Sequence, residues 1–207
     1  MKVPNGSIPL SLLKERLPVI LQERRRNVSL APELIPAAVL IPLFEKEANS
    51  HLLLIKRSRY VQYHPYQVSF PGGVLEVGDR DLKETALRET FEEIGVAVNN
   101  VEILGLLDDY PTISNFRITP FVGIIPYPYH FKINQKETKT LIEVPLITIF
   151  PQRKEKILPS QGGKRHTYIY QSGPFIIWGI TARIIKDFLD ILAMYFEFFA
   201  VLKPLKQ

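Results

Sequence analysis

The stretch GGVLEVGDRDLKETALRETFEEIGV, residues 72–96, decides how this chain is interpreted. Asp81 followed by Glu84 has the spacing of a capping box, in which the side chain of the first residue caps the start of a helix. Gly95 stands where a left-handed residue would end that helix. These signals predict one helix of roughly three to four turns between them.

The helical period of this stretch separates apolar and acidic side chains. At about 100° per residue, the stripe expected to face a core contains Leu87, Phe91 and Ile94. The opposite stripe contains Glu89, Glu92 and Glu93.

Glu92 and Glu93 follow Glu89 by three and four positions, where like charges on a helix repel one another by roughly 0.2–0.5 kcal/mol for each pair. Arg88 alone cannot neutralise them, whereas a divalent cation such as Mg²⁺ takes carboxylate oxygens as ligands. Just upstream, Phe70 and Pro71 lead into the pair Gly72–Gly73, a turn that lets the backbone approach a ligand closely. An ordinary solvated acidic face is the alternative, and the glycine turn favours a metal site over it.

Composition and charge narrow the class of protein. The chain has 207 residues, 46% of them hydrophobic and 23% charged, as expected for one globular domain. It has no cysteine, which excludes a disulfide framework and fits the expected cytoplasmic location. We find no apolar segment of the length of a signal peptide core or a membrane span, so no membrane partner is expected. The net charge of +5 comes from scattered basic residues without interleaved aromatics, which favours a small anionic substrate over nucleic acid.

The remaining pattern predicts an α/β (α+β) fold with a mixed sheet between helices. Expected strands cover residues 35–44, 51–58, 101–107, 117–125 and 169–178. Expected helices cover residues 10–30, interrupted near Pro18, and 179–202, whereas residues 153–168 are expected to form a flexible basic loop. The predicted division is an N-terminal helical extension (1–30), a main domain (31–192) and a C-terminal helix end with a tail (193–207). Because apolar side chains surround the last helix, we expect residues 193–202 to form a homodimer contact.

The run from Gly73 to Val96 resembles the Nudix box, a motif of pyrophosphate hydrolases. The matching positions are Gly73, Arg88, Glu89, Glu92, Glu93, Gly95 and Val96. Fourteen residues separate Gly73 from Arg88, one more than in the standard box, and Asp79 stands in for its first glutamate.

This insertion, with an upstream motif, is similar to the coenzyme A pyrophosphatase subgroup of that family. The upstream matches are Leu53, Leu54, Arg57, Ser58, Phe70, Pro71, Gly72 and Gly73. Three positions depart from the motif: Ile55 replaces threonine, Gln62 replaces arginine and Tyr66 replaces glycine. The resemblance covers roughly residues 35–190 and implies a Nudix fold that hydrolyses coenzyme A to 3′,5′-ADP and 4′-phosphopantetheine.

The resemblance also implies roles for individual residues. Mg²⁺ or Mn²⁺ would be held by Glu89, Glu92, Glu93 and the carbonyl of Gly73. Catalysis would involve Arg88, which orients a carboxylate, and a general base that is either Glu89 or Glu93, with Glu137 as an alternative outside the box. The residues expected to bind the substrate are Arg57, Ser58, His64, Gln67 and Phe70.

Two other functions remain open at this point. The departures at Gln62 and Tyr66 allow another substrate, such as ADP-ribose or another nucleotide sugar. A third hypothesis is a nucleotide-sensing module without catalysis, although the complete acidic cluster argues against it.

Overall fold

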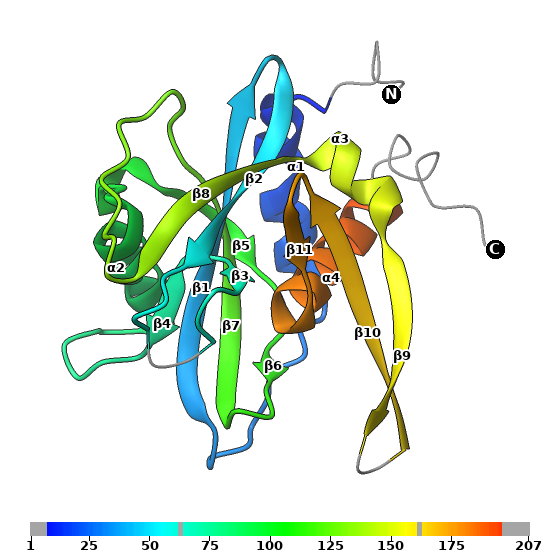
Figure 1. Cartoon of the computed structure of the whole chain (residues 1–207). Coiled ribbons are helices and arrows are strands. Elements are labelled where there is room, and N and C mark those ends of the chain that lie inside the picture. The colour runs from blue at the N-terminus through cyan, green and yellow to red at the C-terminus, as the bar shows by residue number, and fades with distance from the viewer. Residues whose placement is uncertain (1–7, 62–63, 161–162, 196–207) are drawn as a thin grey trace.

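A mixed sheet of eight strands forms the centre of the molecule (Figure 1). The structure, a computed structural model, describes residues 8–61, 64–160 and 163–195. The strands of the central sheet are β1 (Ile35–Lys46), β2 (Asn49–Arg57), β3 (Val68–Ser69), β4 (Gly72–Val74), β5 (Glu102–Leu106), β6 (Tyr110–Pro111), β7 (Phe116–Ile124) and β8 (Thr138–Pro145). A second, antiparallel sheet contains β9 (Lys154–Ser160), β10 (Gly163–Ser172) and β11 (Phe175–Ile177). The helices are α1 (Leu10–Glu23), α2 (Leu82–Ile94), α3 (Leu146–Ile149) and α4 (Gly179–Tyr195), with short 3₁₀ turns η2 (Val98–Asn100) and η3 (Phe150–Gln152).

The order of strands in the central sheet is β3-β2-β1-β7-β5, with β8 paired to β2, β4 to β1 and β6 to β7. Only the β1–β7 pair is parallel within the described sheet, so the sheet is mixed. β1 and β2 form a hairpin that turns at Glu47 and Ala48, whose positive φ angles of 52° and 58° suit a tight two-residue connection.

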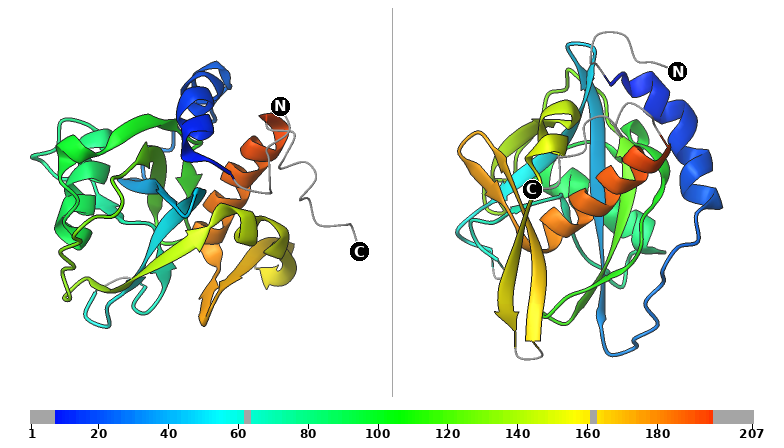
Figure 2. Two further views of the ribbon diagram at one scale, coloured as in Figure 1. Left: turned by 90° about the horizontal axis from the view of Figure 1, so that it is seen from above. Right: turned by 90° about the vertical axis from the view of Figure 1, so that its right-hand side faces the viewer.

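Helices cover both faces of the central sheet, as Figure 2 shows from above. On one face, Ala86 and Ile94 of α2 pack into a cluster with Leu53. On the other face, α1, α3 and α4 contribute to a larger cluster that includes Leu17 and Phe188. This arrangement confirms the expected mixed sheet between helices.

Helix α2 begins and ends where the sequence predicts. The Asp81 carboxylate accepts a hydrogen bond from the Glu84 N–H at 2.8 Å, and Gly95 is left-handed with φ of 75°. The predicted core stripe is partly wrong, because Phe91 is 53% exposed whereas Thr90 is buried. Thr90 can face the sheet because its hydroxyl donates to the Ala86 carbonyl at 2.6 Å, which satisfies the polar atom inside the helix.

The prediction of a flexible basic loop at residues 153–168 is also wrong. Most of this segment belongs to the β9–β10 hairpin, which lies against α4 (Figure 1). Arg153 pairs with Asp190 of α4 at 2.7 Å, and Tyr170 is almost fully buried beside the same helix. Lys154, Glu155, Lys156 and Ile157 of β9 are all exposed, so this strand lacks the alternation of buried and exposed residues that normally indicates a strand.

The two terminal helices differ from the sequence prediction in their extent. α1 is one continuous helix with Pro18 inside it, and it ends at Glu23. α4 is described as far as Tyr195, so most of the proposed dimer contact at 193–202 lies outside the described residues. No helix in the described part of the chain is long and apolar enough to cross a membrane. The predicted domain boundaries stay a prediction.

Candidate active site

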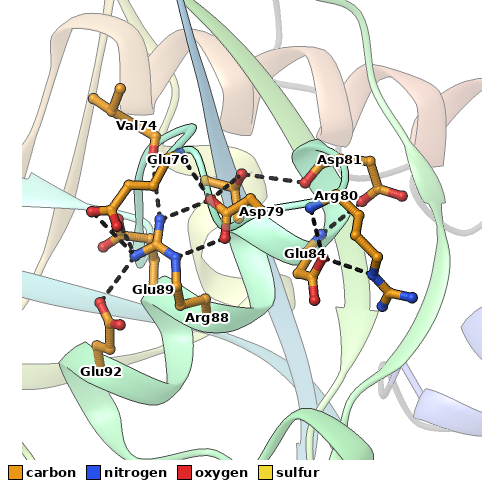
Figure 3. A network of polar contacts seen from close by, with 10 residues as sticks. Val74, Glu76, Asp79, Arg80, Asp81, Glu84, Arg88, Glu89 and Glu92 are labelled. Carbon is orange, nitrogen blue, oxygen red and sulfur yellow. Dashed lines mark hydrogen bonds and ion pairs between the residues drawn. The ribbon is translucent and has the colours of Figure 1, made fainter.

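Arg88 of α2 joins the loop before the helix to the acidic cluster on it (Figure 3). Its Nε and Nη2 donate to the two carboxylate oxygens of Asp79 at 2.9 and 3.0 Å, and Nη2 also donates to the Val74 carbonyl at 3.1 Å. Its Nη1 donates to Glu89 at 2.9 Å and to Glu92 at 3.0 Å. One guanidinium therefore fixes two of the three glutamates relative to the loop.

Asp79 replaces the first glutamate of the box and lies inside this network. It accepts a hydrogen bond from the Thr85 hydroxyl at 2.9 Å and from the Glu76 N–H at 3.0 Å, in addition to those from Arg88. Hydrogen bonding to Arg88 holds the pKa of Asp79 well below its ordinary value, so this carboxylate stays charged. Asp79 thus gives Arg88 a permanent partner.

Glu93 lies at the buried end of the cluster. It is 2% exposed, accepts a hydrogen bond from the Gly72 N–H at 3.0 Å and lies 3.6 Å from Nη1 of Arg57. Burial raises the pKa of Glu93 to about 8, against the opposing effects of Arg57 and the Gly72 N–H. Burial also raises the pKa of Glu89, against the opposing charge of Arg88. Carboxylates with raised proton affinity suit acid–base chemistry near neutral pH.

The glycine turn lies directly against this cluster. β4 pairs with β1, which brings Gly73 opposite Ala38 and beside α2. A Cβ atom at Gly73 would lie 2.2 Å from Oε1 of Glu89, so a side chain there would displace the Glu89 carboxylate. At Gly72 the φ of 152° and a Cβ position 2.3 Å from the Ala38 carbonyl also require glycine.

The chemistry of these donors fits a hard divalent cation. Glu89, Glu92, Glu93 and the backbone at Gly73 supply only oxygen ligands, the type that Mg²⁺ prefers. In the described residues, no group of three or more His, Asp or Glu side chains is already spaced to hold a metal ion. Arg88 explains the spacing, since it holds the carboxylates of Glu89 and Glu92 toward itself. Arg88 contacts Oε1 of Glu89 and Oε2 of Glu92, so the second oxygen of each carboxylate would bind the ion while Arg88 keeps its position.

A pocket of about 180 Å³ opens beside the glycine turn, which we call the glycine-side pocket. Its lining includes Arg57, His64, Gln67, Phe70, Gly72 and Gly73. Four of the five residues expected to bind substrate therefore meet at one place. Ser58 does not join them, because it is buried and lines a different pocket.

Several residues of this region were absent from the sequence prediction of the site. The lining of the glycine-side pocket also includes Phe116, Ile118, Ile180, Thr181 and Ile184. Thr181 donates a hydrogen bond to the Val68 carbonyl at 3.1 Å, which ties the start of α4 to the pocket. The sequence signal was the stretch IWGITARI, residues 177–184, which resembles the subgroup; its charged residue, Arg183, does not line the pocket.

Glu137, the alternative base, also lies near the cluster. Its carbonyl accepts from the Ser58 N–H at 2.7 Å, and its carboxylate accepts from Asn134 at 3.2 Å. Burial is the main cause of the raised pKa of Glu89 and of Glu93, and the negative charge of Glu137 raises both further. Gln62, whose replacement of arginine marks a departure from the motif, lies outside the described residues.

Comparisons with known proteins agree on one family. A family model described as NUDIX domain matches residues 34–157. The protein named "Uncharacterized Nudix hydrolase NudL" from Enterobacter sp. (strain 638) is 37% identical over 153 residues, which cover 73% of this chain and 79% of that protein. The protein of the same name from Pectobacterium atrosepticum is 36% identical over 171 residues, which cover 79% of this chain and 88% of that protein.

One solved structure, a MutT/nudix family protein from Enterococcus faecalis, has a TM-score of 0.50 to this chain. The two are 14% identical, and the match covers 88% of this chain and 72% of that one. At this identity the likeness is one of fold alone.

Proposed function

This chain belongs to the NUDIX domain family, and from that premise we propose that it is a coenzyme A pyrophosphatase. Family membership makes it a pyrophosphate hydrolase of the Nudix type, in a family that uses divalent metal ions. The proposed reaction adds water across the P–O–P bridge of coenzyme A, which gives 3′,5′-ADP and 4′-phosphopantetheine. The same activity on a coenzyme A derivative releases the corresponding derivative of 4′-phosphopantetheine.

The observation that carries the hydrolytic part is the contact between Glu89 and Gly73. A Cβ atom at Gly73 would overlap the Glu89 carboxylate, so the oxygens of Glu89 lie directly against the Gly73 backbone. Mg²⁺ or Mn²⁺ would be held there by Glu89, Glu92, Glu93 and the Gly73 carbonyl, where it would offset the substrate's phosphate charge and acidify a water molecule.

The chain's own side chains then have separate tasks. Arg88 orients Glu89 and Glu92 from its fixed position on Asp79. Glu89 or Glu93 accepts the proton of the attacking water, because burial gives both a raised pKa. The choice between them stays open, and Glu137 is the alternative. Arg57, at the rim of the glycine-side pocket, contacts a substrate phosphate.

The choice of coenzyme A rests on the upstream motif and on the shape of the adjoining pocket. The motif residues Arg57 and Phe70 line a pocket whose lining also includes the apolar residues Ile180 and Ile184. An apolar wall beside a phosphate-binding arginine suits an uncharged chain attached to a pyrophosphate, as in the pantetheine arm. We propose that His64 and Gln67 donate to that arm, and that Ser58 holds the backbone between the two pockets.

One observation favours a second class of substrate. The residue at position 62 is glutamine where the subgroup has arginine, so one expected phosphate contact is missing and another nucleoside diphosphate, such as ADP-ribose, becomes the alternative. A sensor without catalysis is disfavoured, because such a protein has no use for a repulsive carboxylate cluster.

The test is hydrolysis of a substrate panel. The protein is incubated with Mg²⁺ or Mn²⁺ and coenzyme A, dephospho-coenzyme A, ADP-ribose or diadenosine polyphosphates, and the products are identified by mass. Preferred release of 3′,5′-ADP from coenzyme A supports the proposal. Preferred cleavage of ADP-ribose establishes the alternative, and turnover of no substrate with either metal favours the sensor.

A further inference from the structure

A second recess is lined in part by the segment that follows β2 and shares no lining residue with the glycine-side pocket. It has a volume of about 370 Å³ and is lined by Ser58, Arg59, Tyr60, Tyr66, Gln135 and Lys139. We call it the tyrosine recess. Apart from Ser58, none of these residues has a role in the site described above.

The tyrosine recess lies next to the acidic cluster. Ser58, in its wall, directly follows Arg57, which pairs with Glu93. The Ser58 N–H donates a hydrogen bond to the backbone carbonyl of Glu137. The negative charge of the Glu137 side chain contributes to the raised pKa of both Glu89 and Glu93. The adjacent residues Arg57 and Ser58 therefore connect the acidic cluster with the recess.

The recess contains two cationic side chains, Arg59 and Lys139, that have no carboxylate partner among the described residues. The guanidinium of Arg59 lies 4.6 Å from the centre of the Tyr60 ring, and its Nη2 donates to the Tyr60 hydroxyl. In the part of the chain that the structure describes, neither Arg59 nor Lys139 forms an ion pair with an acidic side chain. Arg57 and Arg88, by contrast, both have glutamate partners. Arg59 is thus held in place with its charge available to an anion.

The two tyrosines provide exposed aromatic surface at the same place. Tyr60 is 68% exposed and Tyr66 is 52% exposed. Tyr66 has a left-handed backbone with φ of 63°, a conformation that is strained for a bulky residue and accessible to glycine. The recess therefore offers two aromatic surfaces to a ligand.

We propose that the tyrosine recess binds a second, unreacting phosphate and the purine ring of the nucleoside that carries it. Arg59 and Lys139 pair with a phosphomonoester, and the rings of Tyr60 and Tyr66 contact the purine. The inference rests on the proposed function, because in coenzyme A this group is the adenosine 3′-phosphate. It also gives the chain a cationic contact three positions before Gln62, where the subgroup motif has its second arginine.

The first test measures binding without hydrolysis. Isothermal titration calorimetry compares 3′,5′-ADP with 5′-AMP on the wild-type protein and on the double variant Arg59→Ala, Lys139→Ala. Loss of charge-assisted hydrogen bonds predicts that the wild type prefers 3′,5′-ADP by roughly tenfold or more and that the double variant loses this preference. The matched control is Arg16→Ala, an exposed arginine of α1, which does not line the recess, and this variant should keep the preference. Equal affinity of the wild type for the two nucleotides, or a preference that survives in the double variant, overturns the proposal.

The second test uses Tyr66→Gly, which removes the ring and leaves a residue that accepts the left-handed backbone. We expect this variant to bind 3′,5′-ADP at least threefold more weakly while its melting temperature stays equal or rises, because the strain is relieved. Unchanged affinity overturns the role of the ring. Both tests are independent of turnover, so a wild type that binds 3′,5′-ADP selectively but cleaves no coenzyme A refutes the proposed function and not the recess.

Discussion

Arg88 donates two parallel hydrogen bonds to Asp79, from Nε at 2.9 Å and from Nη2 at 3.0 Å. The pair joins a loop residue to a helix residue nine positions later, and it leaves Nη1 of Arg88 for Glu89 and Glu92. Asp79 therefore controls the acidic cluster through Arg88 without contacting it.

The first prediction concerns this pair. Asp79→Asn removes the buried charged partner that accepts two hydrogen bonds from Arg88, so we expect the free energy of unfolding to fall by roughly 1–3 kcal/mol. Turnover should fall at least tenfold, because Glu89 and Glu92 lose their fixed orientation. Denaturant unfolding and steady-state kinetics measure the two effects. Arg80→Ala, which breaks only the exposed pair with Glu84, is the control and should change both little. Full activity in Asp79→Asn contradicts the positioning role.

The second prediction concerns the contact between Gly73 and Glu89. Gly73→Ala places a methyl group against the Glu89 carboxylate and should displace it, with loss of nearly all turnover. Gly78→Ala, in the same loop, is the matched control, because a Cβ there meets no atom within 4 Å. Initial rates at saturating metal compare the variants. Equal rates would show that the backbone at Gly73 has no part in the site.

The third prediction follows from the pKa of Glu93. In the unfolded chain this carboxyl ionises near 4.5, whereas in the folded protein it stays protonated up to about 8. Between these values the folded state binds more protons, so the free energy of unfolding falls as the pH rises. In EDTA, the melting temperature of the wild type should therefore drop relative to Glu93→Gln from pH 5 to pH 8. Parallel curves for the two proteins would place Glu93 in a polar, solvated environment instead.

The fourth prediction concerns the end of α4. Met194 is 76% exposed and Tyr195 is 48% exposed, and the sequence beyond them, which lies outside the described residues, is rich in phenylalanine. We expect residues 193–202 to hold two copies together, so the mass in solution should be that of a dimer. Truncation after Leu192 should give a monomer by light scattering. A full-length chain that is already monomeric at micromolar concentration removes this proposal.

Local signals in the sequence predict the helix of the acidic cluster well. Asp81 and Gly95 each act on backbone atoms within a few residues, so their effect does not depend on the rest of the fold. The face of the helix is less predictable, because the sheet contacts small residues such as Thr90 and leaves Phe91 exposed. Periodicity records which residues are apolar and not which side the sheet approaches.

Contacts between distant segments were beyond the sequence pattern. The pair Arg57–Glu93 joins the end of β2 to α2, and the contact of Arg88 with Asp79 requires the preceding loop to fold back onto the helix. The β9–β10 hairpin was missed for a related reason: its stability depends on α4, through Arg153 and Tyr170, and not on its own composition. Each of these contacts forms only when the tertiary fold brings the segments together.

The most direct test of the central claim measures 3′,5′-ADP release from coenzyme A by the wild type, Glu89→Gln and Glu84→Gln in saturating Mg²⁺. Glu84 is on the same helix but pairs with Arg80, outside the acidic cluster, so its variant controls for charge loss. We predict metal-dependent release by the wild type and by Glu84→Gln, and a loss of roughly a hundredfold or more in Glu89→Gln. Release by Glu89→Gln at the wild-type rate, or an equal rate without metal, would contradict the account.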